Sequence, residues 1–75
     1  MSISKTFIEY LDTFKTYAEQ VNAGQITWND FAAFQDLESR LTNEYQAGQI
    51  SWKECELLTD LYYTLEQEIR GGANG

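Results

Sequence analysis

A six-residue segment occurs twice in this chain of 75 residues, as AGQITW at residues 23–28 and as AGQISW at residues 47–52. The two copies also agree further along the chain when they are aligned. The aligned pairs are Asp30 with Glu54, Asp36 with Asp60, Leu37 with Leu61, and Leu41 with Leu65. Agreement over this length in so short a chain indicates a duplicated helix-turn unit.

Each copy contains the residue types that end one helix and begin the next. Gly24 and Gly48 follow segments of helical apolar spacing, and glycine readily adopts the left-handed conformation that closes a helix. Thr27 and Ser51 are then the predicted N-caps of the following helices, because their hydroxyl oxygens can accept a backbone N–H of the first turn. The repeat therefore predicts the same stop and restart at two places.

The residues on either side of each cap support this prediction. Asp30 and Glu54 complete the pattern S/T-x-x-D/E, in which the acid bonds back to the cap residue and favours the positive end of the helix dipole. The residues before the caps are apolar, and we expect them to pack against the fourth residue of the next helix. These pairs are Ile26 with Phe31 and Ile50 with Cys55.

Together these signals predict an all-α fold, a three-helix antiparallel bundle with helices at about residues 4–23, 28–46 and 52–70. Residues 1–70 form a single domain and residues 71–75 a mobile tail. Apolar residues at helical spacing are expected to face the core. They are Phe7, Leu11, Phe14, Ala18 and Val21; Phe31, Phe34, Leu37, Leu41 and Tyr45; and Cys55, Leu58, Leu61 or Tyr62, Leu65 and Ile69. The alternative is a long helical hairpin that completes its core by dimerising.

An acidic composition limits the partners. The chain has 12 acidic and 5 basic residues and a net charge of −7. Nucleic acids and anionic membranes are bound through Lys and Arg, so we expect neither as a direct partner. The acids either keep the chain soluble or attract a basic protein.

The location follows from cysteine usage and hydropathy. The single cysteine, Cys55, excludes an intrachain disulfide. No segment has the apolar length of a membrane span or a signal peptide. We therefore expect a cytoplasmic protein.

The repeat is similar to the second half of a calcium-binding EF-hand loop, G-x-I-[ST]-x-x-[DE]. Calcium requires oxygen ligands at the preceding loop positions, and those positions hold Val21 and Ala23 in the first copy and Tyr45 and Ala47 in the second. These side chains carry no carboxylate or amide oxygen. The sequence therefore predicts no calcium site.

The repeat resembles more fully the SHOCT (short C-terminal) domain, a helical hairpin with the pattern G-x-I-[ST]-x-x-[DE]-[FY]. Residues 24–31 fit this pattern throughout, and residues 48–54 fit it up to Cys55, where an aromatic residue is usual. The resemblance covers most of residues 17–70. It implies a small accessory or oligomerisation module without catalysis or cofactors.

The residue types do not favour an enzyme. The chain contains no His, the commonest general base and metal ligand. Cys55 occupies the position of a small core residue. Glu56 and Asp60 share a helix face and could form an acidic strip with Asp36, but three helices rarely enclose the cleft that carboxylate catalysis needs. We expect no catalytic, cofactor or metal residues.

Aromatic residues provide the candidate interaction sites. Tyr62 and Tyr63 are adjacent and lie about 100° apart around a helix, so one of them should be exposed. Trp28 and Trp52 begin their helices beside the turns, where each either seals an end of the bundle or presents a binding edge. The predicted interaction residues are Tyr62, Tyr63, Trp28, Trp52, Asp36, Glu56 and Asp60.

Two functions stay open at this point. The first is a small acidic non-enzymatic module that binds another protein, or a second copy of itself, through exposed aromatic and aliphatic side chains. The second is an inhibitor whose acids occupy the basic nucleic-acid-binding site of a host protein. Small, proline-free, acidic, aromatic-rich chains resemble phage-encoded proteins of this kind, which act in the host cytoplasm. The acids are spread over all three predicted helices, which favours the first function.

Overall fold

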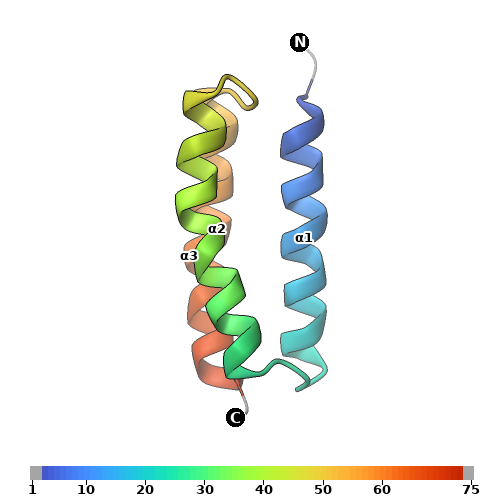
Figure 1. Ribbon diagram of the computed structural model, residues 1–75. Helices are drawn as coiled ribbons and strands as arrows, with labels where there is room; N and C mark the ends of the chain where they lie inside the picture. The colour runs from blue at the N-terminus through green and yellow to red at the C-terminus, as the bar shows by residue number, and fades with distance from the viewer. Residues whose placement is uncertain (1–2, 74–75) are drawn as a thin grey trace.

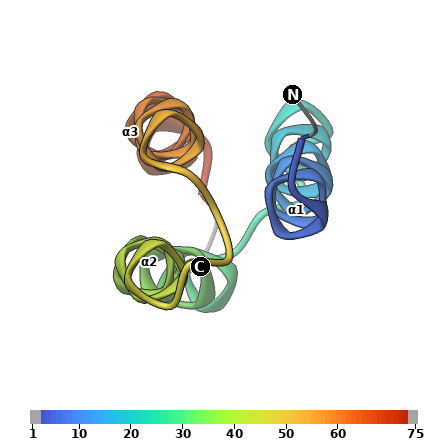
Figure 2. The same ribbon diagram turned by 90° about the horizontal axis from the view of Figure 1, so that it is seen from above.

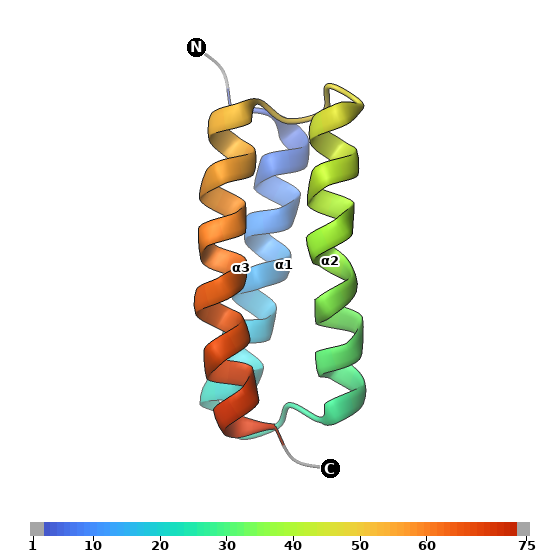
Figure 3. The ribbon, with the colours of Figure 1, turned by 90° about the vertical axis from the view of Figure 1, so that its left-hand side faces the viewer.

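The computed structural model describes residues 3–73, which form three long helices joined by short turns (Figure 1). They are α1 at Lys5–Asn22, α2 at Trp28–Gln46 and α3 at Trp52–Gly72. α1 and α3 run in the same direction and α2 runs in the opposite one (Figures 1 and 3). Viewed along their length, the helices stand at the corners of a triangle (Figure 2). The predicted all-α bundle is confirmed, as a rod about 40 Å long.

α2 and α3 begin with the reciprocal hydrogen bonds that the repeat predicts. The Thr27 hydroxyl oxygen accepts the N–H of Asp30 at 3.2 Å, and the Asp30 carboxylate accepts the N–H of Thr27 at 3.0 Å. Ser51 and Glu54 form the same pair at 3.1 and 2.9 Å. Both capping boxes therefore satisfy backbone donors that the first helical turn leaves without a partner.

α1 and α2 end in the same left-handed turn. Gly24 has φ +68° and donates its N–H to the Val21 carbonyl at 3.0 Å, while Gln25 donates to the Gln20 carbonyl at 2.9 Å. The second copy has the same two bonds at the same lengths around Gly48, at φ +78°. This pair of bonds defines the Schellman motif, so the predicted glycine stops are confirmed.

The core is a column of apolar side chains centred on Phe34 of α2, which is 0% exposed. Its ring stacks on that of Tyr62 from α3, with centroids 4.6 Å apart. Phe14 and Tyr17 of α1 approach the same ring at 6.0 and 5.1 Å. One phenyl group therefore contacts both neighbouring helices. The buried residues are Phe7, Tyr10, Phe14, Ile26, Phe31, Phe34, Leu37, Leu41, Ile50, Leu58, Tyr62, Leu65 and Ile69.

Helical spacing predicted most of this core, including one of the two alternatives on α3, and was wrong at two positions, Leu11 and Tyr45. Leu11, predicted inward, is 36% exposed, and its neighbour Tyr10 is buried instead. Tyr45 was also predicted inward but is exposed beside the turn. Of the two candidates on α3, Tyr62 is buried and Leu61 is exposed. Where two adjacent residues are both apolar, only one can fit between the helices, and packing against the neighbours decides which.

The apolar residues that precede the two caps are both buried. Ile26 and Phe31 are both buried at the first turn. Ile50 is buried at the second, while Cys55 is half-buried against the core with its Sγ 4.0 Å from the Leu41 carbonyl oxygen. The thiol therefore behaves as a small apolar side chain at the edge of the core.

α3 extends beyond its predicted end and includes Gly71 and Gly72. The N–H of Ala73 bonds to the Ile69 carbonyl at 2.8 Å, and Ala73 packs against the core. Neither Gly71 nor Gly72 has a positive φ, so these glycines continue the helix instead of closing it. The predicted tail at residues 71–75 was therefore placed too early, and residues 74 and 75 lie outside the described part of the chain.

Candidate interaction surface

The beginnings of α1 and α3 are joined by one carboxylate. Glu54 accepts the backbone N–H and the hydroxyl of Ser4, each at 3.0 Å, in addition to its bond from Ser51. Ser4 is itself the N-cap of α1, because its hydroxyl oxygen accepts the N–H of Phe7 at 3.2 Å. Hydrogen bonds to the ionised carboxylate, first from Ser51 and then from Ser4, lower the pKa of Glu54. We call this arrangement the shared cap.

Beyond the shared cap, α1 and α3 leave a groove of about 260 Å³ between them. Leu11, Phe14 and Ala18 line it from α1, and Leu61 and Leu65 line it from α3. Lys15 and Thr64 complete its border. The walls are thus almost entirely hydrocarbon, and this part of the α1–α3 seam stays open to solvent.

Exposed aliphatic side chains flank this groove. Ile8 is 54% and Leu11 is 36% exposed on α1, and Leu57 is 45% and Leu61 is 40% exposed on α3. Residues three or four apart share a helix face, so each pair continues the groove by one turn toward the shared cap. We call these four residues, together with the groove, the α1–α3 face. Contiguous apolar patches of this kind mark contact sites in small soluble proteins.

The seam between α2 and α3 is closed by comparison. The hydroxyl of Tyr63 on α3 donates to the Glu38 carboxylate on α2. Where α3 ends and α2 begins, the Arg70 guanidinium lies over the Phe31 ring, 5.4 Å from its centroid. These contacts cover the core between the two helices.

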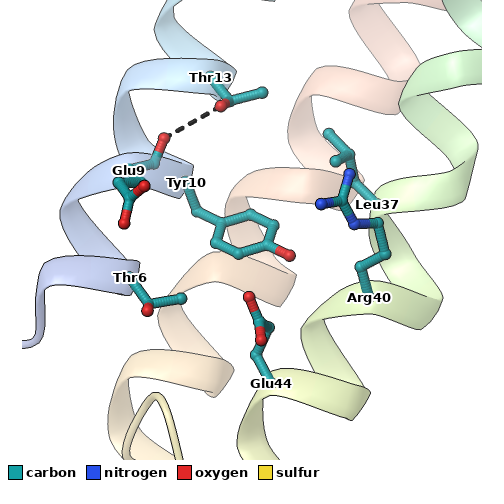
Figure 4. Close-up of a pocket in the computed structure, with 7 residues that line it drawn as sticks. All are labelled: Thr6, Glu9, Tyr10, Thr13, Leu37, Arg40 and Glu44. Carbon is teal, nitrogen blue, oxygen red and sulfur yellow. Dashed lines mark hydrogen bonds between the residues drawn. The ribbon is translucent and has the colours of Figure 1, made fainter.

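The seam between α1 and α2 holds a polar hollow of about 230 Å³ (Figure 4). The ring of Tyr10 crosses from α1 toward Arg40 and Glu44 of α2. Within residues 3–73 its buried hydroxyl forms no hydrogen bond of full geometry, but it lies close enough to Glu44 and Arg40 to interact with both. Burial, and then the Glu44 carboxylate, raise the pKa of Tyr10.

Trp28 and Trp52 are both largely exposed, and each contacts one other aromatic ring. Trp28 is 50% exposed and meets Phe31 edge-on, with ring centroids 5.8 Å apart. Trp52 is 62% exposed and meets Tyr45 at 5.6 Å. Each therefore covers part of one end of the bundle and keeps a free edge. Their use in binding stays a prediction.

Of the two adjacent tyrosines, Tyr63 is exposed and Tyr62 is not. Placing Tyr62 among the interaction residues was therefore wrong, because its stacking on Phe34 buries it to 2% exposure. Burial, followed by the charges of Glu66 and Glu38, raises the pKa of Tyr62 to about 12. Tyr63 remains accessible on the outer surface of α3.

The three predicted surface acids are all exposed, on two different helices. Glu56 and Asp60 are both exposed on α3, where Glu56 pairs with Lys53 at 3.7 Å. Asp36 is exposed on α2, and its part in an acidic strip stays a prediction. Within residues 3–73, no cluster of His, Cys, Asp or Glu is arranged to hold a metal ion.

Ile8 and Leu57 of the α1–α3 face were missed by sequence reasoning, and a signal for them exists. Each stands next to a buried residue, Phe7 and Leu58 respectively, so the apolar band is wider than one core stripe requires. A second stripe one residue away, repeating at helical spacing, indicates a face left over after the core is filled.

No described helix combines the length and hydropathy that crossing a bilayer would require. Comparison of the chain with protein-family models, with curated proteins and with solved structures found no match.

Proposed function

We propose that this chain is a small, acidic, non-enzymatic protein-interaction module and that the α1–α3 face is its contact surface. The observation that supports this is the set of four exposed aliphatic side chains beside an apolar groove. Moving a half-exposed aliphatic side chain from water into a protein contact contributes on the order of 1 kcal/mol. These four side chains, of which Leu11 and Leu61 also line the groove, form the apolar surface of the proposed contact together with the other groove residues.

The other parts of the proposal rest on the sequence. A chain without His lacks the commonest acid–base group, which disfavours a catalytic role. The resemblance of residues 24–31 and 48–54 to the SHOCT pattern agrees with an accessory or oligomerisation role. Trp28, Trp52 and Tyr63 offer further exposed aromatic surface at other places on the rod.

The test compares three immobilised proteins in extracts of the cells that make the chain. They are the wild type, Leu57→Ser/Leu61→Ser, and the control Ala32→Ser/Ala33→Ser on the exposed surface of α2. We expect a partner, identified by mass spectrometry, to be retained by the wild type and the control and lost by the leucine variant. Equal retention by all three folded proteins would show that the α1–α3 face is not the contact surface.

Salt separates this function from the acidic inhibitor of a nucleic-acid-binding protein. Attraction by exposed acids is screened between roughly 50 and 300 mM salt, whereas apolar contact is hardly affected. A basic partner lost at high salt, and insensitive to the leucine substitutions, would favour the inhibitor. Against this alternative, Asp30, Glu54 and Glu38 are already engaged in hydrogen bonds within the chain.

A further inference from the structure

We infer that the partner on the α1–α3 face is a second copy of this chain, packed in the antiparallel direction. This inference rests on the proposed function, in which the α1–α3 face is the contact surface. It adds the identity of the occupant and its orientation. Three observations support it: the charges along the face, the size of the rod, and the apolar surface that each of two copies would contribute to the contact.

The exposed charges that border the α1–α3 face differ in sign between its two ends, while the half-buried Glu54 of the shared cap lies at the lysine end. α1 and α3 run in the same direction, so their first turns lie at one end (Figure 3). Lys5 and Lys53 are exposed at that end, and Glu19 and Glu68 are exposed at the other. At 1.5 Å per residue, the two ends of this charge pattern lie about 20 Å apart.

These four charged residues border the apolar surface. Lys5 precedes Ile8 by one turn, and Lys53 precedes Leu57 by one turn, so each lies on the same side of its helix as the aliphatic residue. At the far end, Glu19 follows the groove residue Lys15 by one turn, and Glu68 follows Thr64. Lys53 pairs with Glu56, but its side chain stays 77% exposed and can contact a partner.

An antiparallel copy places opposite charges together. A two-fold axis perpendicular to the rod brings the lysine end of each copy onto the glutamate end of the other, and the contact is made twice by symmetry. A parallel copy would place lysines against lysines and glutamates against glutamates. Because the net charge of −7 opposes self-association, complementary pairs at both ends are needed to offset it. Asp12, Lys15 and Asp60 lie between the ends, where both signs are present.

The rod has the dimensions that such a dimer requires. It is 40 Å long and 15 to 20 Å across. One full side therefore offers on the order of 600–800 Å², close to the roughly 800 Å² that each partner buries in a standard interface. Each copy contributes the same apolar groove and the same four aliphatic residues, and the paired α1 and α3 helices would form a four-helix layer.

Sedimentation equilibrium between about 1 and 300 µM tests the dimer directly. We expect the wild type and Ala32→Ser/Ala33→Ser to associate into dimers and Leu57→Ser/Leu61→Ser to stay monomeric. A wild type that is monomeric throughout this range overturns the inference. The proposed function would then still be supported by a different partner that the leucine variant fails to retain.

Charge reversal tests the orientation. In Lys5→Glu/Lys53→Glu both ends of the face are acidic, and in Glu19→Lys/Glu68→Lys both are basic. We expect each variant alone to self-associate at least about tenfold more weakly than the wild type, and an equimolar mixture to recover dimers. Circular dichroism checks folding. Substitutions that leave self-association unchanged, or a mixture that stays monomeric, overturn the antiparallel arrangement.

Discussion

The most consequential difference between the two copies of the repeat is one methylene group. The Asp30 carboxylate accepts two hydrogen bonds from its own cap residue, Thr27, one from the backbone N–H and one from the hydroxyl. The equivalent Glu54 is longer, and its carboxylate also reaches Ser4 at the start of α1. A side chain that closes a local turn in the first copy therefore connects two helices in the second. Sequence alone predicted the local bond but not the connection, because Ser4 is distant along the chain.

The lowered pKa of Glu54 predicts a loss of stability in acid. Its folded pKa lies below the ordinary value of 4.5, so its contribution is complete above that pH and is lost as the pH falls through the folded pKa. We expect Glu54→Gln to be less stable than the wild type at pH 7 and the difference to shrink below pH 4.5. Urea unfolding across this range measures it. Asp36→Asn, on the exposed surface of α2, is the control and should not reproduce this pattern.

Replacing Tyr10 by phenylalanine is expected to make the protein more stable. Its buried hydroxyl forms no hydrogen bond of full geometry with any residue from 3 to 73, and an unsatisfied buried polar group costs about 1–3 kcal/mol. We expect Tyr10→Phe to raise the free energy of unfolding by roughly 1 kcal/mol, measured by urea denaturation. Tyr62→Phe is the matched comparison, because the Tyr62 hydroxyl donates to Glu66 at 3.4 Å. A loss of stability in Tyr10→Phe would show that this hydroxyl is satisfied in solution.

At the scale of the helices, the positions of the helix ends could be predicted from sequence, but the side of each helix that faces the core could not. Caps depend on residues within one turn of each other, so Thr27 and Gly24 could be placed from sequence. The choice between Tyr10 and Leu11, or between Tyr62 and Leu61, depends on neighbouring helices, which local spacing does not contain. The α1–α3 face could not be predicted from sequence for the same reason, since it consists of apolar residues that remain exposed once the helices have packed.

The left-handed turns can be tested against a glycine in ordinary helical conformation. Gly48 has φ +78°, and a Cβ there would meet no atom within 4 Å, so Gly48→Ala isolates the backbone cost. We expect a loss of roughly 1 kcal/mol. Gly71 is helical and equally open, so Gly71→Ala should instead stabilise by about 0.5–1 kcal/mol. Thermal melts measure both variants, and shifts of the same sign would contradict the assignment of Gly48 as a helix stop.

For the whole molecule, stability depends on a small core with one aromatic centre. Phe34 contacts side chains from both other helices, and a chain of this length has a net stability of only about 3–5 kcal/mol. Phe34→Ala should cost about 3–5 kcal/mol and leave much of the chain unfolded at 25 °C. Far-UV circular dichroism measures this. Trp52→Ala removes a larger but 62% exposed side chain and should cost less than about 1 kcal/mol. A folded Phe34→Ala variant would mean that the core tolerates a large cavity.

Because the number of helices is odd, groups attached before the first helix and after the last one lie at opposite ends of the rod. The polypeptide enters the rod at the start of α1 and leaves it at the end of α3, and these two helix ends lie at opposite ends of the rod (Figure 1). Protein domains fused before α1 and after α3 would be held apart by a stiff spacer of about 30 Å, which is the length of the 21 residues of α3 at 1.5 Å per residue. Energy transfer between a donor and an acceptor dye at these positions would therefore be low while the bundle is folded, because the rod keeps the dyes apart.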